Sequence, residues 1–160
     1  MRAISLWQPW ATAVALGSKR IETRHWATAY RGPLAIHAAK RMVRSELQHY
    51  RSHWNWTGAM RGAGWSFGKD AAPIDALPFG TIVAVCDLID CRPTDSFTQA
   101  ELDTPERHPE DIDAYSWTQR QMGNFDLGRF GWVLDNIRAL PEPVPFRGGQ
   151  SFFTVPDELL

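Results

Sequence analysis

Residues 5–40 read SLWQPWATAVALGSKRIETRHWATAYRGPLAIHAAK, and their order of apolar, charged and turn-forming residues predicts a strand, a helix and two further strands. The alternation from Arg2 to Leu6 is typical of a strand. Pro9 fits the first turn of the following helix, because its missing N–H has no helical partner there. Gly17 is suited to end that helix in a left-handed conformation. The segment therefore opens with a strand followed directly by a short helix.

The next two strands differ in character. In the predicted strand from Arg20 to Arg24, side chains alternate, so that Ile21 and Thr23 share one face and the charged residues share the other. The predicted strand from Leu34 to Ala39 is apolar apart from His37, which fits a hydrogen-bonded core histidine better than a catalytic one. The charged strand is the better candidate for chemistry.

The remaining chain adds strands and loops. The strongest strand pattern runs from Thr81 to Cys91, and weaker ones cover 130–140 and 151–155. A helix is expected at 42–53, a Trp- and Gly-rich insertion at about 54–78, acidic loops with short helices at 92–128, and a Pro-rich turn at 141–145. About six strands with few helices predict an α+β domain or a closed barrel rather than a doubly wound parallel sheet, and we expect the strands to share one core in a mixed, closed barrel.

Composition narrows the class of protein. At 160 residues with 44% hydrophobic and 22% charged residues, the chain is expected to form a single domain spanning 1–160. It shows no signal sequence and no apolar run of membrane-spanning length, which predicts a cytoplasmic protein that does not engage a membrane. Cys86 and Cys91 are expected on opposite faces of their strand, and no zinc-ligand spacing is present. We therefore expect no disulfide, metal or cofactor.

Charge is unevenly distributed along the chain. Residues 1–69 contain eleven Lys and Arg against two acidic residues, whereas the rest contains six against sixteen, although the net charge is -1. A basic half is able to hold phosphate even in a nearly neutral protein. The alternative is that folding interleaves the two halves and cancels the asymmetry.

The 5–40 segment resembles the ASCH domain, in particular its ASC-1 coactivator type. The shared features are the opening SLWQPWA, the G-x-K-x-x-E-x-R motif at Gly17, Lys19, Glu22 and Arg24, the aromatic Trp26, and the strand RGPLAIHAAK. Two later blocks also resemble the family, GTIVAVCDLIDC from Gly80 and GGQSFF from Gly148. The resemblance thus extends over nearly the whole chain, except for the Trp-rich insertion.

This resemblance implies a PUA-like mixed β-barrel flanked by helices, with a cleft beside the first helix suited to RNA or a nucleotide. Family members are linked to nucleic-acid binding, and one small bacterial relative is a hydrolase that deacetylates N4-acetylcytidine. That relative uses a lysine and a threonine in the corresponding motif. Here the threonine position is Glu22, which removes the proposed nucleophile while Lys19 and Arg24 remain.

The motif and its neighbours supply the candidate site. Lys19 and Arg24 are cations suited to phosphate, and Glu22 is able to read base amino groups; we expect them at the rim of the barrel, outside the core. Trp7 is the better stacking candidate of the nearby indoles, and Gln8 either reads a base edge or caps the helix. The expected nucleic-acid-binding residues are Trp7, Gln8, Lys19, Glu22, Arg24, Trp26, Arg31, Lys40 and Arg41.

Three functions follow from these residues. The leading one is a nucleic-acid-binding module for single-stranded or modified RNA, with DNA or a modified nucleoside also possible. The second is a hydrolase of a nucleoside amide or an RNA phosphodiester, with Lys19 and Glu22 as catalytic residues. The third is a protein-interaction module that uses the Trp-rich insertion. The sequence alone does not separate them.

Overall fold

The computed structural model describes residues 1–41, 77–104 and 118–160 of the chain. The predicted helix at 42–53 and nearly all of the Trp-rich insertion lie outside these residues. In chain order the elements are β1 (Arg2–Leu6), α1 (Trp10–Ala15), β2 (Ile21–Arg24), β3 (Gly32–Ala38), β4 (Thr81–Pro93), η2 (Thr94–Ser96), α4 (Gln99–Asp103), η3 (Gln119–Met122), β5 (Phe130–Pro145), β6 (Phe153–Thr154) and η4 (Asp157–Leu159).

The strands form one six-stranded mixed sheet in the order β2-β5-β4-β3-β1-β6. Only β1 and β3 pair in parallel, and the other neighbours are antiparallel. The six predicted strands are confirmed in position, but the expected turn at 141–145 is wrong. That stretch continues β5, with Val144 opposite Ile82 and Pro145 opposite Thr81. A register shift between Ile82 and Ala84 of β4, opposite residues 140–143, accommodates the prolines, which lack an N–H for the ladder.

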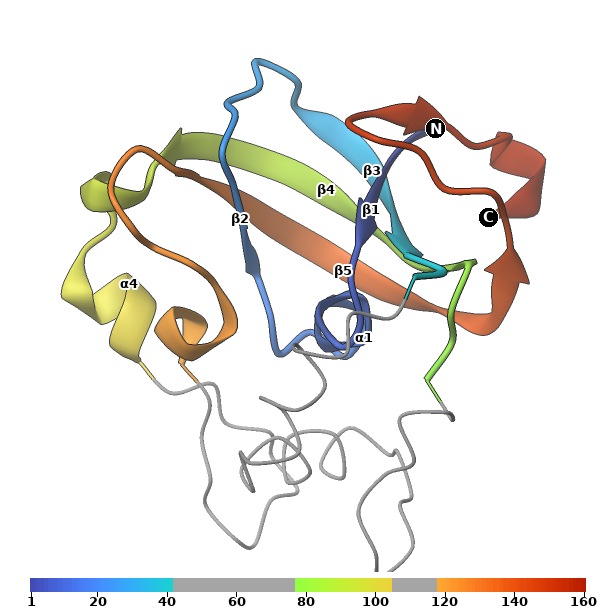
Figure 1. The fold of residues 1–160 in the computed structure, drawn as a ribbon, viewed down its shortest axis with the longest axis horizontal. Coiled ribbons are helices and arrows are strands. Elements are labelled where there is room, and N and C mark those ends of the chain that lie inside the picture. Colours follow the sequence, from blue (N-terminus) through green and yellow to red (C-terminus); the bar gives the residue numbers. More distant parts are fainter. Residues whose placement is uncertain (42–76, 105–117) are drawn as a thin grey trace, which may run out of the picture.

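The α+β class is confirmed, but the closed barrel is wrong for the described residues. β2 and β6 are edge strands, so the hydrogen-bonded ladder does not close on itself. The sheet curls enough to bring β2 opposite β1, in front of β4 and β5 in Figure 1. Arg24 on β2 bridges the two strands, because its Nη2 donates a hydrogen bond of 2.7 Å to the Ser5 carbonyl on β1. We call this bridged approach of β1 and β2 the seam.

Two apolar layers hold the curled sheet. The inner layer contains alternating residues of the strands and one face of α1, namely Ile4, Leu6, Ala11, Val14, Leu34, Ile36, Leu88, Trp132 and Leu134 among others. Each buried Leu or Ile contributes about 1.5–3 kcal/mol relative to an exposed one. The outer layer lies under the C-terminal segment and contains Ala3, Ala35, Ile82, Val85 and Val155. Because side chains alternate along a strand, odd and even residues of β1 enter different layers.

Both cysteines are free thiols, with Cys86 buried and Cys91 half-buried. Within the three described ranges, no helix combines the length and the apolar character needed to cross a bilayer.

Candidate functional site

Lys19 lies inside the protein and not at a rim, which corrects the expectation from sequence. Its side chain is only 1% exposed. The Nζ donates to the carbonyls of Ile21 at 2.8 Å and Met122 at 2.5 Å, and it lies 3.3 Å from Glu22 Oε2. Burial lowers the pKa of Lys19, and the Glu22 carboxylate opposes that effect. The three acceptors match the three N–H groups of an ammonium, so Lys19 is built into the structure.

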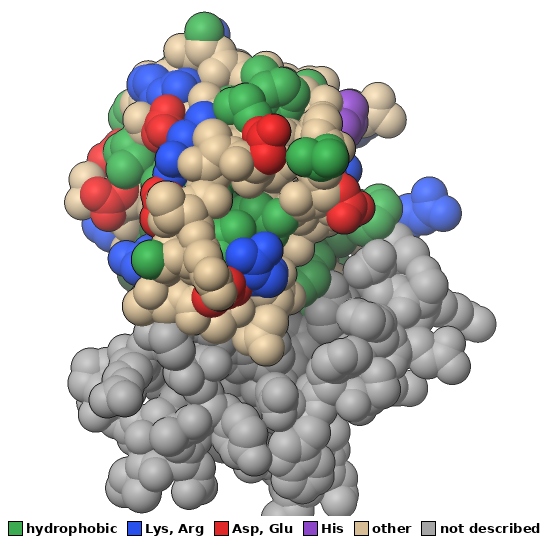
Figure 2. Space-filling model, turned by 90° about the vertical axis from the view of Figure 1, so that its left-hand side faces the viewer, with side chains coloured by type: hydrophobic (Ala, Val, Ile, Leu, Met, Phe, Trp, Pro, Cys, Tyr) green, Lys and Arg blue, Asp and Glu red, His purple; other side chains and the backbone are tan. Residues whose placement is uncertain are grey.

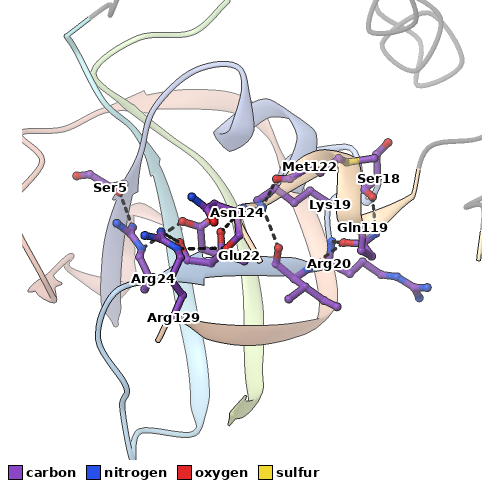
Figure 3. A network of polar contacts seen from close by, with 12 residues as sticks. Ser5, Ser18, Lys19, Arg20, Glu22, Arg24, Gln119, Met122, Asn124 and Arg129 are labelled. Atoms are coloured by element: carbon purple, nitrogen blue, oxygen red, sulfur yellow. Dashed lines mark hydrogen bonds and ion pairs between the residues drawn. The ribbon is translucent and has the colours of Figure 1, made fainter. Parts of the chain in front are cut away.

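Glu22 lies between two cations. One carboxylate oxygen faces Lys19, and the other lies 3.2 Å from Arg24 Nε. That Nε is buried without a hydrogen-bond partner, so Glu22 attracts the guanidinium mainly through its charge. Figure 3 shows Glu22 between the two cations, with Ser5 beyond Arg24. Glu22 is 8% exposed and the Arg24 side chain 24%, so the network is buried at Lys19 and reaches the surface at Arg24.

A tight turn and a distant glutamine fix the start of β2. Gly17 has φ +73°, the left-handed conformation predicted for the end of α1. The Gln119 side chain then accepts hydrogen bonds from the backbone N–H groups of Arg20 and Ile21, at 2.8 and 3.0 Å, and donates to the Ser18 carbonyl at 2.9 Å. η3 therefore supplies both the clamp on β2 and the Met122 carbonyl that binds Lys19.

Sequence reasoning missed the segment that follows η3. The Asn124 N–H donates to Thr23 Oγ1 at 2.9 Å, and Arg129 donates to the carbonyls of Thr23 and Asn124, each at 3.2 Å. Figure 3 shows Arg129 and Asn124 beside Glu22 and Arg24. No periodicity or motif marks Arg129, which lies more than 100 positions beyond Thr23; only tertiary pairing brings a second guanidinium to the seam.

Trp7 is the exposed aromatic residue of the seam, with 49% of its surface accessible. It follows the last residue of β1, where Leu6 pairs with Ala38 and the Leu6 carbonyl accepts the Ala39 N–H at 2.8 Å. Because β1 and β3 are parallel, their chain ends lie together, and the exposed Lys40 and Arg41 follow β3 at the same end. The fold thus brings an indole and two cations to one edge.

Gln8 and Trp26 have internal partners. Gln8 is 3% exposed; its Oε1 accepts hydrogen bonds from the Thr12 N–H and hydroxyl, and its Nε2 donates to the Pro78 carbonyl at 2.7 Å. This is the helix-capping alternative for Gln8. Trp26 packs edge-on against Trp132, with ring centroids 4.6 Å apart, and its carbonyl accepts the Trp132 indole N–H. These contacts make both residues part of the scaffold of the seam.

Arg31 is held by the acidic half of the chain. It pairs with Asp90 at 3.1 Å and donates to the carbonyls of Thr28 and Tyr30. Figure 2 shows positive and negative side chains intermixed on the side that it displays. In the described residues, folding thus partly interleaves the two charge-biased halves. Arg31 fixes the loop before β3, and it shares the Asp90 carboxylate with Arg92.

A cavity of 390 Å³ adjoins the start of β2, next to the Lys19 network. Its lining includes Ile21, whose carbonyl binds Lys19, and Gln119, which clamps β2, together with Arg20, Arg92, Phe97 and Val133. Lys19, Glu22 and Arg24 are not among its lining residues. In the described residues, no group of three His, Cys, Asp or Glu side chains is arranged to hold a metal ion.

Comparison with known proteins points to the same family as the motif at residues 17–24. The model of the ASCH domain family matches residues 4–133. Activating signal cointegrator 1 of Homo sapiens and that of Mus musculus are each 33% identical over 97 residues, which cover 60% of this chain and 15% of the relative. The chain therefore corresponds to a small part of these relatives.

Crystal structures of an ASCH protein from Zymomonas mobilis and of a mutant of it are 12% and 10% identical to this chain. Their TM-scores are 0.47 and 0.45, over 98% of this chain and 88% and 91% of theirs. Because the family model spans most of the chain and includes the whole 17–24 motif, the chain belongs to the ASCH domain family.

Proposed function

We propose that the protein binds single-stranded or modified RNA at the seam, with DNA or a free modified nucleoside as related ligands. The observation that carries this proposal is the network of Lys19, Glu22 and Arg24, which is buried at one end and reaches the surface at the other. A buried ion network is a poor way to gain stability, because desolvation offsets much of the attraction. Lys19, whose pKa is lowered by burial, is an ionisable group of the kind that concentrates at functional sites.

The seam offers groups for different parts of a nucleic acid: Trp7, Lys40 and Arg41 are exposed, Arg24 and Arg129 are half-buried, and Glu22 is largely buried. The Trp7 indole offers a face for base stacking, worth about 1–3 kcal/mol per base. Arg24 and Arg129 offer planar guanidinium groups for phosphate, and Lys40 and Arg41 add charge at the end of β3. Glu22 is an acceptor for a base amino group. Lys19 serves by fixing the Glu22 carboxylate and not by touching the ligand.

The hydrolase alternative requires Lys19 to change its present contacts. A general base needs a free lone pair, whereas Lys19 is surrounded by the Ile21 and Met122 carbonyls and by Glu22. Catalysis by Lys19 therefore requires it to lose at least one of these partners. The protein-interaction alternative is suggested by the cointegrator name of the relatives, but the Trp-rich insertion on which it depends lies almost wholly outside the described residues.

Fluorescence anisotropy with labelled single-stranded RNA and DNA oligonucleotides tests the proposal. We expect Trp7→Ala to weaken RNA binding roughly 5- to 150-fold, the loss of one stacking contact, and Arg24→Gln to weaken it and reduce its salt dependence. Leu159→Ala on η4 and Arg138→Gln on β5 are matched controls, because both side chains are exposed away from the seam. Wild-type affinity in both test variants would refute the seam as the binding site, and turnover of acetylcytidine would favour the hydrolase.

A further inference from the structure

A second polar group lies beneath the C-terminal segment. Ser5 and His37 are register partners on the parallel strands β1 and β3, so their side chains share the outer face of the sheet. Ser5 Oγ lies 3.0 Å from His37 Nδ1 and 3.1 Å from the Gly149 carbonyl, and His37 Nε2 lies 3.1 Å from the Phe146 carbonyl. His37 is 2% exposed in an otherwise apolar layer.

The chain after β5 is seated directly on this pair. A Cβ added at Gly148 would come within 2.3 Å of His37 Cε1 and 2.6 Å of Ser5 Oγ. Atoms at such distances overlap, so only glycine permits the observed approach. The segment Phe146–Gly149 is therefore held on β1 and β3 by close packing and by hydrogen bonds from both Ser5 and His37.

Counting protons shows that the three hydrogen bonds are not independent. The Phe146 carbonyl only accepts, so Nε2 of His37 carries a hydrogen. In a neutral imidazole Nδ1 is then bare and accepts the Ser5 hydroxyl proton, which leaves the Gly149 carbonyl without it. In an imidazolium Nδ1 donates to Ser5 Oγ, and the hydroxyl proton becomes free to reach Gly149.

Ser5 also connects this pair to the seam. Its side chain contacts His37 and the C-terminal segment, while its carbonyl accepts the Arg24 hydrogen bond that bridges β1 and β2. The residue that contacts the segment therefore also supplies the carbonyl that holds the Arg24 guanidinium.

We propose that Ser5 and His37 form a proton-dependent latch, in which the charge of the imidazole sets how firmly Phe146–Thr154 docks on β1 and thereby how Arg24 is held at the seam. The proposed effect on docking of the segment does not depend on the binding function. The proposed effect on Arg24 rests on the proposed binding function. His37 is a positioning residue in this scheme.

Protonation loosens the latch. Burial lowers the pKa of His37 from 6.5, and the Phe146 carbonyl opposes this effect. Ser5 faces the ring from β1, Phe153 of β6 lies edge-on at 5.7 Å, and β4 places Ile82 opposite. None of these is charged, and the charged residue of the covering segment, Arg147, is exposed. An imidazolium gains the Ser5 hydrogen bond to Gly149, but no acidic side chain faces it among these contacts, and burial of its charge remains the larger effect on its pKa.

The direction of the pH dependence follows from the linkage between proton binding and docking. An unfolded or undocked His37 binds a proton near pH 6.5, whereas the docked one does so only at lower pH. The docking free energy is therefore complete above about pH 6.5 and is lost as the pH falls towards the docked pKa. One proton changes the docking equilibrium by at most about tenfold per pH unit.

Hydrogen exchange and imidazole NMR of the full chain test the latch. We expect a neutral His37 carrying its hydrogen on Nε2 at pH 7.5. We also expect amides of 146–154, corrected for intrinsic exchange rates, to lose up to tenfold protection per pH unit below 6.5. His37→Gln should remove this dependence, whereas Ser5→Ala, which keeps the buried imidazole, should retain it. If His37→Gln fails to fold, the NMR titration of His37 in the wild-type protein should span the same pH range as the loss of protection. His25→Gln is the matched control, because His25 is exposed and should leave the dependence intact.

RNA titrations of the same proteins at pH 7.5 and 5.5 test the coupling to Arg24. A loss of affinity at pH 5.5 that both His37→Gln and Ser5→Ala abolish supports it, because Ser5 joins the segment to Arg24. A charged His37 imidazole at pH 7.5, or amide protection of residues 146–154 that does not change with pH, would overturn the latch. A pH-dependent segment in a protein that binds no RNA would keep the latch and refute the proposed function instead.

Discussion

Replacing Lys19 by methionine isolates the buried ammonium, because methionine retains most of the apolar stem. The substitution leaves the Ile21 and Met122 carbonyls without their donor and leaves Glu22 with Arg24 alone. Removing one partner of a buried ion pair costs about 3–5 kcal/mol. In a domain of this size each kcal/mol lowers Tm by roughly 2–4 °C. We therefore expect Tm to fall by roughly 6–20 °C.

Urea unfolding followed by tryptophan fluorescence measures this loss, provided that the m-value is unchanged. Lys40→Met is the matched control, since Lys40 is exposed and its substitution should change stability by less than about 0.5 kcal/mol. The double variant Lys19→Met with Glu22→Gln should cost less than the sum of the single changes, because neither charge is then left alone. A loss of unfolding free energy below about 1 kcal/mol for Lys19→Met would refute the reasoning and indicate that Lys19 is exposed at the rim.

Two further predictions concern the close approach at Gly148 and the burial of Cys86. Gly148→Ala should destabilise the protein by about 1–3 kcal/mol, because its methyl group overlaps His37 and Ser5. Gly149→Ala, whose Cβ would meet Phe153 only at 3.1 Å, should cost less in the same thermal melts, and equal losses would contradict the close approach. Burial raises the pKa of Cys86 to about 12, so at pH 8 iodoacetamide should label the half-buried Cys91 well before Cys86. Mass spectrometry of the native protein checks the order, and faster labelling of Cys86 would contradict its burial.

Much of the fold follows from local sequence. Alternating apolar residues predict the six strands because a strand exposes successive side chains to opposite faces. Pro9 and Gly17 predict the limits of the first helix because their backbone preferences act within one turn. The motif at 17–24 likewise indicates where charge gathers, and Lys19, Glu22 and Arg24 do form one network. The α+β class needed no information beyond these local patterns.

Only the tertiary structure decided how deeply each side chain is buried and which distant residues it contacts. Local pattern predicted Lys19 at the rim, but the Met122 carbonyl and Glu22 enclose it, and an acceptor 103 positions away has no signature in a local window. Arg129 reaches the seam and Arg31 is drawn to Asp90 for the same reason. The curl of the sheet is also a tertiary property, because twist and bulges, not residue alternation, decide whether a ladder closes. The sequence alone thus determined which segments are strands and where charge lies, whereas packing decided which charges are buried, which are paired and which remain for a ligand.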